Sequence, residues 1–182
     1  MINIIGNSST GKSFLMSEII ASARRQYGEK LKWVYLDCEA GYSFDSKAIW
    51  GFQVVDENNP KVDTVEEFAI EIEKTLDSLK KGEKLIYVID SYDAITSEDE
   101  ETEYNKKLDA IEKGKKAEGS YGMAKAKFIN SFFRMMIRKI KEKDCLFIVI
   151  SQTRDNIGGG QFAPKKKRHG GDAIEFYSAQ VF

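Results

Sequence analysis

The sequence contains no long hydrophobic run and carries almost no net charge. Its longest apolar segments, such as residues 145–150, are far shorter than the roughly 20 residues that a membrane-spanning helix needs. Residues 1–5 also lack the charged and the long apolar regions of a signal peptide. The formal net charge is -1, so any attraction to nucleic acid must come from a local patch, and we expect no membrane partner.

Cysteine and histidine are also scarce, which argues against a metal site built from these residues. The two cysteines, Cys38 and Cys145, lie in apolar, strand-like segments with no further ligand at metal-binding spacing. The histidine His169 has no second ligand at a suitable spacing either. We therefore interpret the cysteines as buried, reduced thiols of a cytoplasmic protein.

A glycine-rich segment near the N-terminus carries the strongest functional signal. Residues 6–13 read G-x-x-x-x-G-K-S, the P-loop pattern, whose backbone N–H groups form a nest for phosphates. A chance match in a Gly/Ser turn is the alternative, but a β-branched run at 2–5 and helical spacing after residue 13 favour the P-loop. The expected nucleotide-binding residues are Gly6, Asn7, Ser8, Ser9, Thr10, Gly11, Lys12, Ser13 and Phe14. Lys12 would neutralise the β- and γ-phosphates, and Ser13 would offer its hydroxyl to Mg²⁺.

Apolar runs alternate with helical patterns along one domain of 182 residues, 42% of them hydrophobic. Strands are predicted at 33–37, 52–55, 85–89 and 145–150, with a further strand beginning at 179. Helices are predicted after residue 12, after the capping box at 64–67, from 121 to 140 and at 172–177. Residues 97–119 are a charged insertion, partly helical or mobile, and 153–171 form a Gly-rich basic loop. This alternation predicts an α/β fold with a mainly parallel central sheet and helices on both faces.

Three polar side chains follow predicted strands at the sheet edge that should also hold the P-loop. Ligands bind outside the carboxyl ends of parallel strands, so we expect these side chains to converge. Asp90 would hold Mg²⁺ together with Ser13, the alternative being a strand-end aspartate in a turn. Glu39 would deprotonate the attacking water, and a solvated loop glutamate is an equal alternative. Gln152 would sense the γ-phosphate, although the pattern alone favours a polar strand cap.

Several segments, taken in order, resemble the RecA family of recombination ATPases. Residues 35–40 (Y-L-D-C-E-A) are similar to the strand with the catalytic glutamate, and 88–91 (V-I-D-S) to the Walker B strand. Residues 148–154 (I-V-I-S-Q-T-R) resemble the strand with the γ-phosphate-sensing glutamine, and 170–177 the Gly-Gly-x-Ala-x-x-Phe-Tyr segment. The resemblance implies a three-layer P-loop NTPase of RecA type, with Glu39, Lys12 and Gln152 as catalytic residues. It further implies a cytoplasmic, DNA-dependent ATPase of a bacterium or phage-infected host, using ATP and Mg²⁺ on single-stranded DNA in recombination and repair.

The basic loop at 153–171 is the expected DNA interface. Its charges would contact phosphates and its aromatic ring would stack on bases. A solvated loop and a nuclear-import pattern are the alternatives. The resemblance favours DNA binding by Arg154, Phe162, Lys165, Lys166, Lys167 and Arg168.

Two departures from the family leave alternatives open. Only five residues precede the P-loop, and the chain stops at Phe182 within the last predicted strand. A core-only protein and a shortened chain both fit, so we expect weak self-association here, with a filament or ring in the full-length protein. A hexameric helicase motor and a nucleotide-controlled binding module with little turnover are the alternative functions. A small-molecule kinase ranks last, because the charged insertion contains no arginine.

Overall fold

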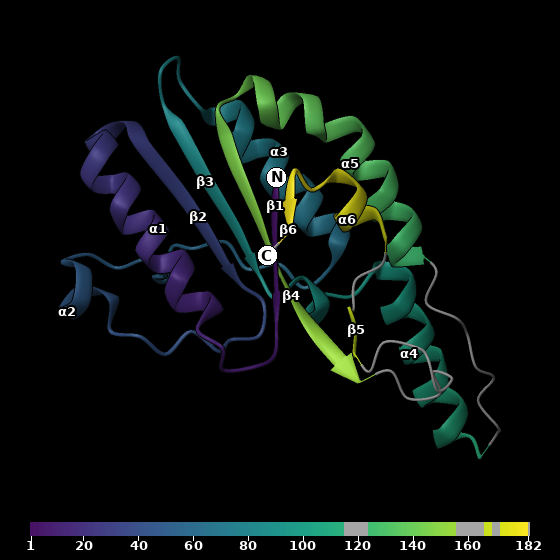
Figure 1. The fold of residues 1–182 in the computed structure, drawn as a ribbon. Helices are drawn as coiled ribbons and strands as arrows, with labels where there is room; N and C mark the ends of the chain where they lie inside the picture. Colours follow the sequence, from purple (N-terminus) through teal and green to yellow (C-terminus); the bar gives the residue numbers. More distant parts are fainter. Residues whose placement is uncertain (115–123, 156–165, 169–171, 182) are drawn as a thin grey trace.

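The central element is a sheet of parallel strands in the order β2-β3-β4-β1-β6 (Figure 1). The computed structural model describes residues 1–114, 124–155, 166–168 and 172–181. The parallel strands are β1 (Ile2–Gly6), β2 (Leu31–Asp37), β3 (Lys84–Asp90), β4 (Cys145–Asp155) and β6 (Gln180–Val181). A short strand, β5 (Lys166–Arg168), pairs antiparallel with the far end of β4. The predicted parallel sheet is therefore confirmed.

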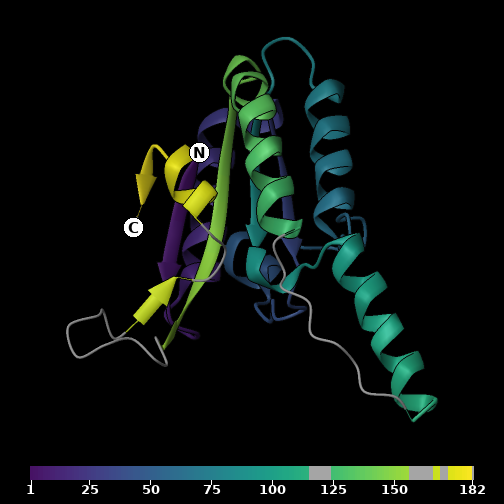
Figure 2. The ribbon, with the colours of Figure 1, turned by 90° about the vertical axis from the view of Figure 1, so that its right-hand side faces the viewer.

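Helices cover both faces of this sheet. They are α1 (Lys12–Tyr27), α2 (Ser46–Trp50), α3 (Val65–Ser78), α4 (Glu98–Glu112), α5 (Ala124–Glu142) and α6 (Asp172–Tyr177). Two 3₁₀ turns, η1 (Gly28–Lys30) and η2 (Tyr92–Ala94), follow α1 and β3. In Figures 1 and 2, α1 lies on one face, and α3, α5 and α6 lie on the other. This is the three-layer α/β arrangement that the sequence predicts. None of the helices in the described residues is long and apolar enough to cross a membrane.

Each face of the sheet has its own hydrophobic core. Met16 and Ile20 of α1 pack with Tyr35 of β2 on one side. On the other side, Phe68 of α3 and Phe133 of α5 pack around Phe147 of β4. Because side chains alternate between the faces of a strand, a strand covered on both sides must be apolar at nearly every position. The central strand β3 shows this directly, since every residue after Lys84 is buried.

The strand predicted at 52–55 is wrong. These residues form an irregular segment whose polar groups are bonded to side chains in place of a neighbouring strand. The Trp33 indole donates to the carbonyl of Val54 (3.0 Å), and the Val54 N–H donates to the Ser46 hydroxyl (3.0 Å). The sequence pattern shows that the segment is apolar, but not that its backbone partners are side chains.

The charged insertion at 97–119 is helical over much of its length. Ser97 and Glu100 form a capping box at the start of α4, and the first turn of α4 carries four acidic residues, which suit the positive end of a helix. No residue of α4 is buried, and in Figure 2 the helix extends beyond the ends of α3 and α5. The prediction of an exposed, partly helical insertion is confirmed for 98–112, and residues 115–119 lie outside the described residues.

The boundaries of the predicted basic loop at 153–171 are wrong. Residues 153–155 continue β4, and Lys166–Arg168 pair with them in the register Thr153↔Arg168, Arg154↔Lys167 and Asp155↔Lys166. The segment therefore begins as a two-stranded ribbon, because the β4 backbone continues its hydrogen bonding beyond the sheet. Residues 156–165 and 169–171 lie outside the described residues.

Both cysteines are free thiols and only partly buried, less than the sequence predicts. Burial raises the pKa of Cys38 to about 12 and that of Cys145 to about 12. Both therefore stay protonated at neutral pH, and neither is a reactive thiolate.

Candidate nucleotide and metal site

The P-loop connects the end of β1 to the start of α1, as its sequence predicts. Gly11 has a left-handed backbone (φ 83°) that favours glycine, and a Cβ at Gly6 would lie 2.9 Å from the Thr10 hydroxyl and displace it. The Thr10 hydroxyl donates to the carbonyl of Asn7 (2.9 Å) and tightens the turn. Lys12 is half-buried and folds back over the loop, donating from Nζ to the carbonyls of Gly6 (3.2 Å) and Asn7 (2.7 Å). Its ammonium group therefore lies against the backbone of the loop that is predicted to hold phosphate.

The hydroxyl of Ser13 and the carboxylate of Asp90 lie against one another. Ser13 Oγ donates to Asp90 Oδ2 at 2.6 Å, although the two residues are 77 positions apart in the sequence. Asp90 is 8% exposed and ends β3, where its peptide bond to Ser91 is cis. The Ser91 hydroxyl donates to the other carboxylate oxygen (3.3 Å). A hydroxyl and a carboxylate are hard oxygen donors of the kind that Mg²⁺ prefers, so the pair fits the metal role predicted for it.

Tyr35 is part of this cluster, and the sequence analysis missed it. Its hydroxyl donates to the same oxygen, Asp90 Oδ2, at 2.6 Å from the middle of β2. Burial raises the pKa of Tyr35, and the Asp90 carboxylate raises it further, so the phenol remains a donor. Only the pairing of β2 with β3, in which Tyr35 lies opposite Val88, brings the phenol to Asp90. No local sequence motif predicts the pairing of β2 with β3.

Two of the three residues predicted to be catalytic, Glu39 and Gln152, contact one another at this edge. Gln152 Nε2 donates to Glu39 Oε1 at 2.6 Å, which joins the end of β4 to the segment after β2. The main chain supports this contact, because Cys38 N–H donates to the carbonyl of Asp90 at 2.6 Å. Glu39 is exposed, so its carboxylate remains open to solvent. The arrangement places one carboxylate and one amide beside the P-loop.

A cavity of about 290 Å³ joins these groups. Its lining includes Glu39, Asp90 and Gln152 together with residues 8–14, whereas Gly6 and Asn7 of the P-loop are not among its lining residues. A larger hollow, about 740 Å³, lies along α4. Three glutamates line that hollow, so its charge disfavours a phosphate, and the smaller cavity is the candidate nucleotide site.

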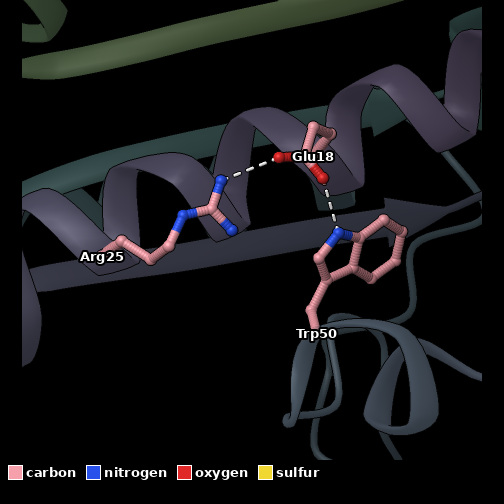
Figure 3. Close-up of polar contacts among 3 residues, drawn as sticks. All are labelled: Glu18, Arg25 and Trp50. Carbon is pink, nitrogen blue, oxygen red and sulfur yellow. Dashed lines mark hydrogen bonds and ion pairs between the residues drawn. The ribbon is translucent and has the colours of Figure 1, made fainter.

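Two aromatic residues, Phe14 and Phe44, line the cavity, and the sequence analysis identified Phe14 but not Phe44. Phe14 lies with its ring centroid 5.6 Å from that of Phe44 and 5.3 Å from that of Trp50. Figure 3 shows how Trp50 is fixed: its indole N–H donates to Glu18 of α1 (2.6 Å), and Arg25 binds the other oxygen of that carboxylate (2.8 Å). The hydrogen bond from Arg25, and then that from Trp50, lowers the pKa of Glu18. The segment after β2 is thus anchored on the helix that follows the P-loop.

Asp37 shapes the start of the same segment. Its carboxylate accepts hydrogen bonds from the N–H groups of Gly41 (3.1 Å) and Tyr42 (2.9 Å). This turn contains Glu39, which bonds to Gln152 of β4. The sequence signal that could have identified Asp37 is its position as an acidic residue at the end of a strand, the same signal that identified Asp90.

The predicted DNA-binding residues fall partly outside the described residues. The backbone of Arg154 belongs to β4 and lies two residues after Gln152. Lys166, Lys167 and Arg168 form β5, which pairs with this end of β4. Phe162 and Lys165 are not among the described residues. One contact ties this region to the P-loop, since the Thr153 hydroxyl donates to Asn7 Oδ1 at 2.6 Å.

Comparison with known proteins identifies a family that agrees with this geometry. Protein RecA of Teredinibacter turnerae is 30% identical over 179 residues, which cover 98% of this chain and 47% of that protein. Protein RecA of Bordetella petrii is 28% identical over 180 residues, covering 98% of this chain and 45% of that protein. The chain therefore spans about half the length of the curated relatives it matches. A family model described as the RecA N-terminal domain matches residues 1–181, and the chain belongs to that family.

Proposed function

We propose that this chain binds ATP with Mg²⁺, hydrolyses it, and acts on single-stranded DNA in homologous recombination or repair. The observation that carries the nucleotide part is the 2.6 Å contact between Ser13 and Asp90 beneath the P-loop. A phosphate nest, a lysine and two hard oxygen donors then surround one cavity. That combination suits a nucleoside triphosphate bound together with a divalent cation.

The residues divide the work of hydrolysis between them. Lys12 is placed to neutralise the charge of the β- and γ-phosphates. Ser13 and Asp90 would hold Mg²⁺, which when bound draws negative charge off the phosphate oxygens. Glu39 is the group that would orient and deprotonate the attacking water, and its exposed carboxylate is open to one. Gln152 fixes the direction of that carboxylate through their 2.6 Å hydrogen bond.

The proposed action on DNA rests on the family and on the basic segment that continues from Gln152. Lys165, Lys166, Lys167 and Arg168 supply positive charge, and Phe162 supplies a stacking surface. A γ-phosphate contact at Gln152 would act at the base of this segment. ATP binding and DNA affinity would thereby be coupled.

ATP hydrolysis measured with and without single-stranded DNA tests the nucleotide part. Lys12→Ala should abolish ATP binding without unfolding, while Lys81→Ala, which changes an exposed turn, is the matched control. Glu39→Gln should keep ATP bound and slow its hydrolysis by about 10²–10⁴-fold, with exposed Glu57→Gln as its control. Tight ATP binding by Lys12→Ala would show that the P-loop assignment is wrong. Unchanged turnover in Glu39→Gln would show that Glu39 is a solvated loop residue and not the catalytic base.

DNA binding needs its own test. Replacing the four basic residues 165–168 with alanine should lower the affinity for single-stranded DNA and leave ATP binding unchanged. For each DNA phosphate that the variant no longer binds, the slope of log affinity against log salt should become shallower by about 0.7. If affinity and slope match the wild type, this segment is not the DNA site, and residues 113–116 become the next candidate.

A further inference from the structure

The neighbouring strands β3 and β4 do not end at the same level of the sheet. The β3–β4 pairing stops at Ile89↔Val149, whereas β4 continues and pairs with β1 as far as Gly6↔Gln152. Beyond Val149, therefore, β4 is no longer paired with β3. The last residues of β4 need another partner on that side, because a strand-end N–H without one costs free energy and leaves the strand free to shift.

A side chain takes over where β3 ends. Asp93, in the 3₁₀ turn η2, accepts the backbone N–H of Gln152 on Oδ2 at 2.8 Å. A hydrogen bond to an ionised acceptor is stronger than one between neutral groups. The carboxylate thus extends the ladder by one step and fixes the main chain of the residue whose side chain reaches Glu39. Asp93 is not among the residues that line the cavity.

The turn that carries Asp93 is held from the other side by α5. Lys125, in the first turn of α5, donates from Nζ to the carbonyls of Tyr92 (3.2 Å) and Ile95. Its ammonium also lies 4.5 Å from the centre of the Tyr92 ring. Burial lowers the pKa of Lys125, and the carboxylate of Asp93 opposes that change. The turn is therefore clamped at both ends around Asp93.

We infer that Asp93 is a positioning residue for ATP hydrolysis: it holds the main chain of Gln152 in the position from which the Gln152 side-chain amide can orient Glu39. The inference rests on the proposed function. The position of a hydrolytic group matters because a displacement on the order of 1 Å can cost about 100-fold in rate. Asp93 bonds to the main chain of Gln152 and does not line the cavity, so its removal should lower kcat and leave nucleotide binding by the P-loop intact.

The test compares kcat and KM for ATP in Asp93→Ala, Asp93→Asn and Asp56→Ala. Asp56 is the matched control, since its carboxylate also accepts a backbone N–H, that of Asn58 at 2.8 Å, in an exposed turn. Asp93→Ala should lower kcat on the order of 10- to 100-fold, with KM within about twofold of wild type. Asp93→Asn keeps an oxygen acceptor and should restore kcat to within a few-fold, and Asp56→Ala should change neither constant.

Two further measurements separate positioning from general damage. Hydrogen exchange of the Gln152 amide, followed by NMR, should accelerate in Asp93→Ala and not in Asp56→Ala. Asp93→Ala combined with Gln152→Ala should be no slower than Gln152→Ala alone, because Asp93 acts through the side-chain amide that Gln152→Ala has already removed. Additive losses, unchanged exchange, or unchanged kcat in Asp93→Ala would each overturn the inference while the wild type still hydrolyses ATP. A wild type without turnover would instead refute the proposed function, and the inference would fall with it.

Discussion

Replacing Tyr35 with phenylalanine removes one hydroxyl from the centre of the candidate metal site. The ring stays, including its contact with Tyr42 at 5.2 Å between centroids, so little packing changes. What disappears is the 2.6 Å hydrogen bond to Asp90 Oδ2. Because Tyr35 is 0% exposed, water cannot replace the missing donor.

The magnitude follows from the charge on the acceptor. A hydrogen bond to a charged group contributes about 1.5–3 kcal/mol to stability, and a neutral one about 0.5–1.5 kcal/mol. Tyr35→Phe should therefore lower the free energy of unfolding by about 1.5–3 kcal/mol. For a domain of this size, that corresponds to a decrease in Tm of about 3–12 °C.

Urea unfolding of Tyr35→Phe and Tyr42→Phe tests this reasoning directly. Tyr42→Phe is the matched control, because its hydroxyl contacts the neutral Ser17 hydroxyl at 2.8 Å and should cost about 0.5–1.5 kcal/mol. In the background of Asp90→Asn, the destabilisation caused by Tyr35→Phe should shrink, since the acceptor is then uncharged. If Tyr35→Phe loses no more stability than Tyr42→Phe, the phenol does not hold the carboxylate.

Two further predictions concern the helix layer formed by α3. Burial raises the pKa of Glu71 despite the hydrogen bond from Thr75, so the ionised form opposes folding once the pH exceeds the ordinary carboxyl value. Glu71→Gln should therefore raise Tm at pH 7–8 and lose this advantage below about pH 4, as thermal unfolding across pH would show. Phe68→Ala should cost about 3–5 kcal/mol in urea unfolding, since Phe68 is 1% exposed and packs on Phe132 and Phe147. A destabilisation below about 1 kcal/mol would mean that this core collapses around the missing ring.

The parts of the site that the sequence predicts are those governed by a general rule of parallel sheets. Glu39, Asp90 and Gln152 each follow an apolar run, and strands that run parallel bring such residues to one edge. Tyr35 could not be found this way, because a tyrosine within an apolar strand has the same pattern as a core residue. Asp93 gives no signal either, since its role depends on β3 ending before β4 does. These contacts depend on register, which is fixed by residues far apart in the sequence.

β4 is the element on which the whole site depends. It pairs with β3, which carries Asp90, and with β1, which leads into the P-loop. Its own Gln152 bonds to Glu39, and the next residue, Thr153, bonds to Asn7 of the P-loop. Because Gln152 and the β5-paired residues 153–155 belong to one continuous strand, a shift of Gln152 moves the backbone of the ribbon directly. A strand paired with a neighbour transmits such a shift along its length, first beside β1 and then beside β5, whereas a loop would absorb it. The candidate nucleotide site and the basic segment are therefore connected by the backbone of β4, which is paired first with β1 and then with β5.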